Sequence, residues 1–193
     1  MKTILVLLIV FGACLSSSYA EGIITFGPKQ TTMIGSIPYT VIGKYIAQFG
    51  AFKGRITLDD GSLRVRSVDL EIEVKSIKSN CPWCDRAARS RRLLNAARFP
   101  RITFKSEEIL RSEGGYKVKG VLEMHGIKRR MIFPFYVRII VDQRSRHRSL
   151  DLKGSWSINR KDFDIVWNRY LDRGGVLVGD YFTVDWGIRA DFN

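Results

Sequence analysis

The sequence predicts an all-β fold in which an antiparallel sheet curls around its apolar side, as a barrel or a sandwich. Residues 68–74 alternate between apolar side chains at even positions and charged side chains at odd positions, and residues 182–192 show the same period of two. Successive side chains of a β-strand point to opposite faces, so each stretch has one apolar and one polar face. Such stretches, separated by turn residues and little helix, are typical of barrels and sandwiches.

Eight strands are expected, and they occupy residues 36–41, 52–58, 63–77, 102–104, 116–124, 131–141, 150–158 and 182–192. The third stretch switches parity between Val65 and Val68, which predicts a bulge or bend near Arg66 and Ser67. His125-Gly126 predicts a turn between two of the later strands.

One helix is expected over residues 85–98, because alanine, leucine and arginine dominate this stretch and favour helix. Asp85 would serve as its N-cap or as an acid in its first turn. The helix must end before Pro100, which disfavours a helical conformation at Phe99.

The first twenty residues predict an export signal. Lys2 supplies the positive charge, residues 4–11 form a short apolar run, and Ser18-Tyr19-Ala20 predicts cleavage before Glu21. An uncleaved anchor is one alternative, and lipidation at Cys14, after an imperfect lipobox, is another. We therefore expect residues 21–193 to form a single domain in a protein that is periplasmic or secreted.

The chain is strongly basic, with a formal net charge of +13 that falls by one when the signal is removed with Lys2. Inside a cell this charge would indicate nucleic acid as a partner. For an exported protein, anionic lipid headgroups, pyrophosphates or acidic glycans are more available, and the charge also fits a surface that is only solvated. We expect no nucleic-acid partner.

Motifs for catalysis are missing from the sequence. After the signal it contains two histidines, His125 and His147, with no Ser/His/Asp arrangement, no glycine-rich phosphate loop and no HExxH motif. His125 lies at the predicted turn, where a structural hydrogen bond is expected. Two separate histidines are too few for a histidine-rich metal site. We expect no enzyme and no bound metal.

Cys81-Pro82-Trp83-Cys84 is a CxxC motif between a predicted strand and the predicted helix. Both thiols would meet an oxidising compartment after export, so a disulfide is feasible. A helix N-terminus and nearby arginines would raise the reactivity of Cys84. A structural disulfide, redox exchange and soft-metal binding all stay open. Haem attachment needs a histidine at position 85, where this chain has Asp85.

Six arginines lie on or just beyond the predicted helix: Arg86, Arg89, Arg91, Arg92, Arg98 and Arg101. They form either a solvated outer face or an anion-binding rim. The second interpretation rests on the match between the guanidinium group and phosphate geometry.

The inside of the predicted sheet carries large apolar side chains. Eight strands enclose either a packed core or a cavity for one small ligand. The periodicity alone leaves both interpretations open.

Several motifs together resemble one family. They are, in order, Phe49-x-x-Phe52-x-Gly54, Arg98-Phe99-Pro100, Tyr116-x-Val118-x-Gly120, His125-Gly126-Ile127, Ile158-Asn159-Arg160-x-Asp162-Phe163 and Val178-Gly179-Asp180. In this order and spacing they resemble the YceI-like family of exported polyisoprenoid-binding proteins. The resemblance covers essentially the whole chain after the signal.

The resemblance implies an eight-stranded antiparallel, lipocalin-like barrel with one α-helix in a connection. It also implies an elongated apolar pocket for an isoprenoid lipid, such as a quinone tail or a polyprenyl phosphate, and often a homodimer. Three features depart from the family pattern: Asp164 replaces the usual glycine, the helix is richer in arginine, and the CPWC segment is unusual. The last two would mean a changed headgroup preference or an added redox role.

We therefore expect a non-enzymatic carrier whose only bound small molecule is an isoprenoid lipid. The residues expected to line its interior are Leu70, Ile72, Phe104, Val118, Leu122, Phe135, Trp156, Ile158, Val184 and Trp186. Asn159, Arg160 and the helix arginines are the candidates for contact with a headgroup or for the mouth of the barrel. An anionic headgroup or a membrane surface is a candidate partner. Cys81 and Cys84 are the candidates for a disulfide or a redox pair. Two alternative functions are a thiol–disulfide redox protein acting near a bound lipid or quinone, and a module that binds anionic surfaces through the basic helix.

Overall fold

The computed structural model describes residues 22–29, 31–40, 42–59, 64–141, 143, 148–169 and 177–192. The expected export signal, Cys14 and His147 lie outside the described residues.

The strands within these residues are β1 (Gly22–Phe26), β2 (Thr31–Tyr39), β3 (Gly43–Phe49), β4 (Phe52–Leu58), β5 (Val65–Glu73), β6 (Ile77–Lys78), β7 (Arg101–Ser112), β8 (Gly115–Met124), β9 (Ile127–Val141), β10 (Arg148–Asn159) and β11 (Tyr181–Phe192). The helices are α1 (Pro82–Arg89) and two short 3₁₀ turns, η1 (Val74–Ser76) and η2 (Arg160–Phe163).

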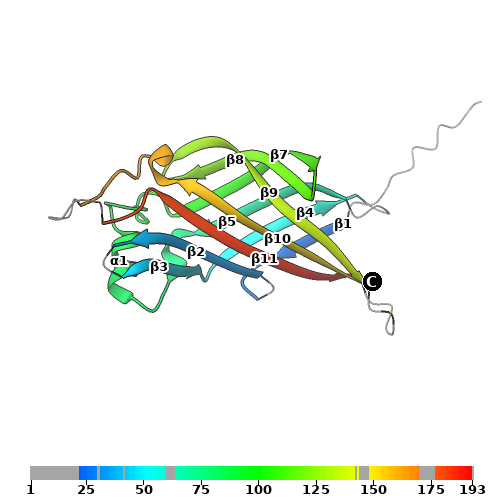
Figure 1. Cartoon of the computed structure of the whole chain (residues 1–193), viewed down its shortest axis with the longest axis horizontal. Helices are drawn as coiled ribbons and strands as arrows, with labels where there is room; N and C mark the ends of the chain where they lie inside the picture. The colour runs from blue at the N-terminus through cyan, green and yellow to red at the C-terminus, as the bar shows by residue number, and fades with distance from the viewer. Residues whose placement is uncertain are drawn as a thin grey trace, which may run out of the picture.

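All these strands belong to one antiparallel sheet in the order β1-β4-β5-β7-β8-β9-β10-β11-β2-β3-β6. β6 follows β5 after only the three residues of η1, and it pairs with β3 through Gln48↔Lys78 and Phe49↔Ile77. This pairing brings the last strand in the order back to the chain that forms β5. The sheet therefore curls into an elongated barrel, with α1 at one end (Figure 1).

The fold class is as predicted, but the described residues contain eleven strands where eight were expected. The expected strand over residues 63–77 is divided by η1 into β5 and β6, and β1 and β3 were not anticipated. Both missed strands carry a large exposed apolar residue, Ile23 in β1 and Ile46 in β3. These side chains obscure the alternation that identifies a half-buried strand.

The helix is shorter than predicted and starts earlier. α1 begins at Pro82, a residue favoured in the first turn of a helix because its missing N–H needs no partner there. It ends where Ser90 adopts an extended backbone, and the chain then forms turns through Asn95, which has a positive φ of 46°. Helix propensity over residues 90–98 was thus overridden by the tertiary structure.

Two local predictions are confirmed. Leu58 pairs with Val65 and Thr57 with Ser67, so Arg66 is the extra residue of a bulge that switches the parity of β5. His125 and Gly126 form the turn between β8 and β9, with φ of 54° and 77°. The His125 ring holds this turn against η2 through a 3.0 Å hydrogen bond between Nδ1 and the carbonyl oxygen of Phe163.

The inward faces of the strands form one apolar cluster that extends along the barrel. Aromatic rings dominate its centre. The rings of Phe133 and Trp156 stack with centroids 4.3 Å apart, and Trp186 meets Trp156 edge-on at 5.3 Å. A ligand inside the barrel would contact these rings.

Candidate ligand-binding chambers

A cavity of about 70 Å³, here called the inner chamber, lies within the barrel. Its wall is formed by apolar side chains, with Thr31 as the only polar residue among the described residues that line it. All ten residues predicted to face the interior lie on this wall: Leu70, Ile72, Phe104, Val118, Leu122, Phe135, Trp156, Ile158, Val184 and Trp186. Their contact with a ligand stays a prediction.

A second cavity of about 170 Å³, the outer chamber, lies under α1. Trp83, Cys84 and Ala88 of α1 form part of its wall, and Tyr39 and Ala47 contribute from β2 and β3. Trp167, from the segment after η2, also lines this chamber. The outer chamber therefore depends on how α1 is held against the sheet.

The two chambers share five lining residues, here called the neck: Phe49, Ile102, Met124, Phe182 and Val184. The two chambers are therefore adjacent, with the neck side chains between them, and their mostly apolar linings follow one another from α1 into the barrel. This series is here called the apolar path. Each chamber is smaller than the roughly 300–1,000 Å³ of typical ligand pockets. A long lipid tail would therefore require the neck side chains to move apart.

A buried carboxylate anchors α1 beside the outer chamber. Tyr45 of β3 donates a hydrogen bond to Asp85 Oδ1 at 2.8 Å. Ser79 donates to the same carboxylate from its hydroxyl at 2.6 Å and from its backbone N–H at 3.0 Å. The described contacts of Asp85 thus join α1 to the strand that pairs with β6.

These contacts also set the ionisation of the pair. Burial raises the pKa of Asp85, but the hydrogen bonds from Ser79 and Tyr45, together with the charge of Arg89, outweigh it and hold this pKa below its usual value. For Tyr45, burial and then the hydrogen bond to Asp85 raise the pKa above its usual value. Asp85 is therefore charged and Tyr45 protonated across the neutral range.

The CxxC motif lies at the start of α1. Cys81 and Cys84 are joined by a disulfide, with their Cα atoms 5.2 Å apart. Cys84 is buried and lines the outer chamber, whereas Cys81 is partly exposed. The disulfide therefore lies between solvent and the outer chamber.

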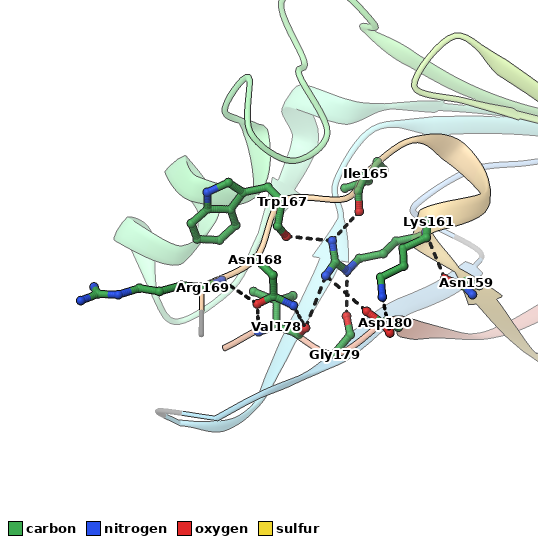
Figure 2. A network of polar contacts seen from close by, with 10 residues as sticks. Asn159, Lys161, Ile165, Trp167, Asn168, Arg169, Val178, Gly179 and Asp180 are labelled. Atoms are coloured by element: carbon green, nitrogen blue, oxygen red, sulfur yellow. Dashed lines mark hydrogen bonds and ion pairs between the residues drawn. The ribbon is translucent and has the colours of Figure 1, made fainter. Parts of the chain in front are cut away.

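The guanidinium group of Arg160 is hydrogen-bonded within the protein. Its Nε donates to the carbonyl of Gly179 at 2.8 Å, and its Nη1 donates to the carbonyls of Ile165 and Trp167. Its Nη2 donates to the carbonyl of Val178 at 3.4 Å and to Asp180 Oδ1 at 3.5 Å. Figure 2 shows these acceptors converging on one guanidinium group.

All five N–H groups of the Arg160 guanidinium are already used within the protein, so a headgroup would have to displace one of these acceptors. Arg160 also lines the outer chamber, and its contact with a headgroup stays a prediction. Asn159 also has a local role, since its side chain accepts a hydrogen bond from the backbone N–H of Lys161 and caps η2. Asn159 is not among the residues that line either chamber. Both residues hold η2 and the segment that leads into β11.

The six predicted arginines separate into groups. Arg89 donates to the carbonyls of Asp85 and Lys75, and Arg101 lies 3.5 Å from Glu71. The other four are exposed and are here called the arginine segment: Arg86, Arg91, Arg92 and Arg98. Arg92 lies over the ring of Trp167, a wall residue of the outer chamber, and Arg98 over Phe99. Within the described ranges, none of the four makes an ion pair and none lines a chamber.

Sequence reasoning missed several wall residues. Thr31, Met33 and Phe49 come from the start of β2 and from β3, where no strand was expected. Phe49 was named only as part of a family motif, although it lies at the neck. Their only signal was the inward parity that they share with other residues of the same strands.

No group of three or more His, Cys, Asp or Glu side chains is placed to hold a metal ion in the part of the chain that the structure describes. Among the same residues, no helix is long and apolar enough to cross a membrane.

Comparison with known proteins identifies relatives. A family model described as the YceI-like domain matches residues 25–190. A UPF0312 protein of Yersinia pestis (strain Pestoides F) is 34% identical over 79 residues, which cover 41% of this chain and 41% of that protein. The chain therefore matches less than half the length of this curated relative.

Two solved structures share the fold. The crystal structure of Burkholderia cenocepacia BcnA matches with a TM-score of 0.67 and 18% identity, covering 83% of this chain and 96% of BcnA. A polyisoprenoid binding domain from Saccharophagus degradans, implicated in plant cell wall breakdown, matches with a TM-score of 0.59 and 12% identity, covering 86% and 96%. Since the family model spans most of its length, the chain belongs to the YceI-like family.

Proposed function

We propose that this protein is a non-enzymatic carrier that sequesters a long isoprenoid-type lipid, such as a quinone or a polyprenyl phosphate, in its two adjacent chambers. We further propose that it acts outside the cytoplasm, after cleavage of the signal before Glu21. The observation that carries the proposal is the elongated apolar path formed by the inner chamber, the neck and the outer chamber.

The physical basis is burial of apolar surface. Each buried CH₂ group contributes about 0.8 kcal/mol, so a prenyl tail binds tightly without any polar contact. The branched tail also suits a wall of aromatic and branched aliphatic side chains. Membership of the YceI-like family and the fold shared with a polyisoprenoid binding domain support the same ligand class.

The test is mass spectrometry of lipid extracted from the protein after purification from its exported form. We expect a stoichiometric isoprenoid lipid, and we expect the N-terminal residue of the purified protein to be Glu21. A protein that repeatedly carries no lipid and binds no added prenyl compound would overturn the carrier function. A matched variant, Ile158→Phe, adds bulk to the inner wall without adding a charge, and it should carry less lipid while retaining the fold by circular dichroism.

A second function is favoured by one observation, the position of Cys84 on the wall of the outer chamber. In this alternative the reduced pair would pass two electrons and two protons to a bound quinone, forming the Cys81–Cys84 disulfide and the quinol. The test compares the wild-type protein with Cys84→Ser in insulin reduction and in quinone reduction driven by dithiothreitol. Equal rates for the two proteins would exclude redox function.

A further inference from the structure

Two polar atoms on the wall of the inner chamber have no hydrogen-bond partner among the residues that the structure describes. They are the hydroxyl oxygen of Thr31 and the indole nitrogen of Trp186. Thr31 is only 8% exposed, and both residues line the inner chamber. A buried polar group without a partner costs free energy, so most such groups in proteins are paired with protein, water or ligand.

The sheet register places both residues on one part of the chamber wall. Thr31 pairs with Ile188 and Met33 pairs with Trp186, so Thr31 and Trp186 are diagonal neighbours across β2 and β11. Along β11 they lie beyond the neck residues Phe182 and Val184, on the side away from the outer chamber. They therefore mark the inner end of the apolar path.

The orientation of Trp186 depends on a glycine. A Cβ atom at Gly154 would lie 2.7 Å from Trp186 Nε1, so the ring occupies the space that Gly154 leaves free. Trp156, the neighbouring indole, donates its N–H to the carbonyl of Pro134 at 3.0 Å. The two indoles thus differ in one respect: the N–H of Trp156 is satisfied by protein and that of Trp186 is not.

The chemistry of these atoms restricts what could pair with them. An indole N–H only donates, so its partner must supply an acceptor, whereas a threonine hydroxyl donates or accepts. No Lys, Arg or His is among the described residues that line the inner chamber. A charged end would be buried there without a counter-charge, which is strongly unfavourable.

We propose that Thr31 and Trp186 form a subsite for a neutral, oxygen-bearing end of the ligand, such as a carbonyl, ether or hydroxyl group, which enters the barrel first. This inference rests on the proposed carrier function and adds orientation and selectivity to it. The apolar tail then extends through the neck toward the outer chamber. A prenyl phosphate would have to bind in the opposite orientation or more weakly.

The test uses four probes with the same prenyl chain: geranylgeraniol, its methyl ether, the corresponding hydrocarbon and geranylgeranyl phosphate. Affinities are measured by displacement of a fluorescent lipid from delipidated protein. The alcohol and the ether should bind more tightly than the hydrocarbon. Thr31→Val and Trp186→Phe should each weaken binding of the ether by about three- to tenfold, the typical value of one hydrogen bond, and leave the hydrocarbon unchanged.

The control variant is Met33→Leu, which changes the same wall without altering a polar atom. It should affect all four probes equally. A second readout uses the indole N–H signals in nitrogen-15 spectra. The Trp186 signal should shift downfield with the ether and not with the hydrocarbon, while the Trp156 signal, whose N–H is already bonded, should remain in place.

The possible outcomes distinguish a failure of the subsite from a failure of the carrier function. If the ether and the hydrocarbon bind equally in wild type and variants, and the Trp186 signal does not move, the subsite is overturned and the carrier function stands. If no probe binds, the carrier function fails together with the subsite. If Thr31→Val lowers the stability of the delipidated protein, a buried water already satisfies the hydroxyl, and the subsite loses its basis.

Discussion

The guanidinium of Arg160 joins three stretches of backbone: η2, the segment through Trp167, and the residues that lead into β11 (Figure 2). Burial lowers its pKa, and the nearby charge of Asp180 opposes that effect. We expect Arg160→Met to lower the free energy of unfolding by about 3 kcal/mol or more, because it leaves several buried carbonyl groups without a donor. Urea denaturation followed by circular dichroism measures the change.

The control for Arg160 is its neighbour Lys161, which pairs with Asp180 at 2.7 Å but is about half exposed. Lys161→Met should cost less than about 1 kcal/mol, as is usual for exposed ion pairs. Equal losses in the two variants would contradict the structural role assigned to Arg160.

Asp164 shows why the family pattern usually has glycine at this position. It ends η2 with a φ of 57° and a ψ of 24°, in the left-handed region that glycine adopts without steric cost. We expect Asp164→Gly to raise the free energy of unfolding by up to about 1 kcal/mol. Asp162→Gly, inside η2, should instead lower it, and a loss of stability in Asp164→Gly would refute this explanation. Urea denaturation of both variants provides the measurement.

Secondary-structure elements were predictable to different degrees. β4 has the predicted bounds, and the bulge at Arg66 appears where the parity of the sequence switches. β1 and β3 were missed because Ile23 and Ile46 are 56% and 54% exposed, so apolar residues occur on both parities. The bounds of α1 were predicted wrongly because helix propensity does not depend on which side chains are buried. Asp85 lies in the first turn of α1, one of the two positions predicted for it, but its burial was not anticipated.

The attachment of α1 to β3 predicts a pH dependence. The pKa of Asp85 is below its usual value in the folded protein, so its contribution to stability is present above about pH 4 and is lost as the pH falls through the folded pKa. Asp85→Asn should be less stable than wild type at neutral pH, and the difference should shrink below about pH 4. Urea denaturation across pH measures it, with exposed Asp162→Asn as the control.

Tyr45 predicts a loss of stability at the opposite end of the pH range. Its pKa is raised in the folded protein, so its contribution is present below about pH 10 and is lost as the pH rises further. The difference between wild type and Tyr45→Phe should therefore shrink only in alkali. A difference that is constant at both extremes of pH would show that the Tyr45–Asp85 hydrogen bond does not hold α1.

At the scale of the whole molecule, the arginine segment lies beside the outer chamber and is free of ion pairs in the described ranges. We propose that it contacts anionic membrane surfaces. Arg86→Glu/Arg91→Glu should strongly reduce binding to phosphatidylglycerol vesicles, since each arginine near such a surface contributes about 1 kcal/mol. Wild-type binding should also weaken as salt increases. Vesicle co-sedimentation at several salt concentrations measures both effects.

The control is Lys117→Glu/Lys119→Glu, a charge change of the same size on β8. β7 begins at Arg101, directly after the turns that follow α1, and Lys117 pairs with Leu110 of this strand, so Lys117 lies roughly 30 Å along the barrel from that end. These variants should bind vesicles nearly as well as wild type. Binding of wild type that does not depend on salt would eliminate the membrane role.

The sequence by itself determined the curled all-β fold and the inward face of its strands, because a period of two depends only on which residues are apolar. All ten predicted interior residues lie on the inner wall for this reason. The tertiary structure alone decided which polar groups are free. Backbone carbonyls and the Asp180 carboxylate use every N–H of the Arg160 guanidinium, and the polar atoms of Thr31 and Trp186 have no partner among the described residues. The sequence could not show this, because most such partners come from other segments of the chain.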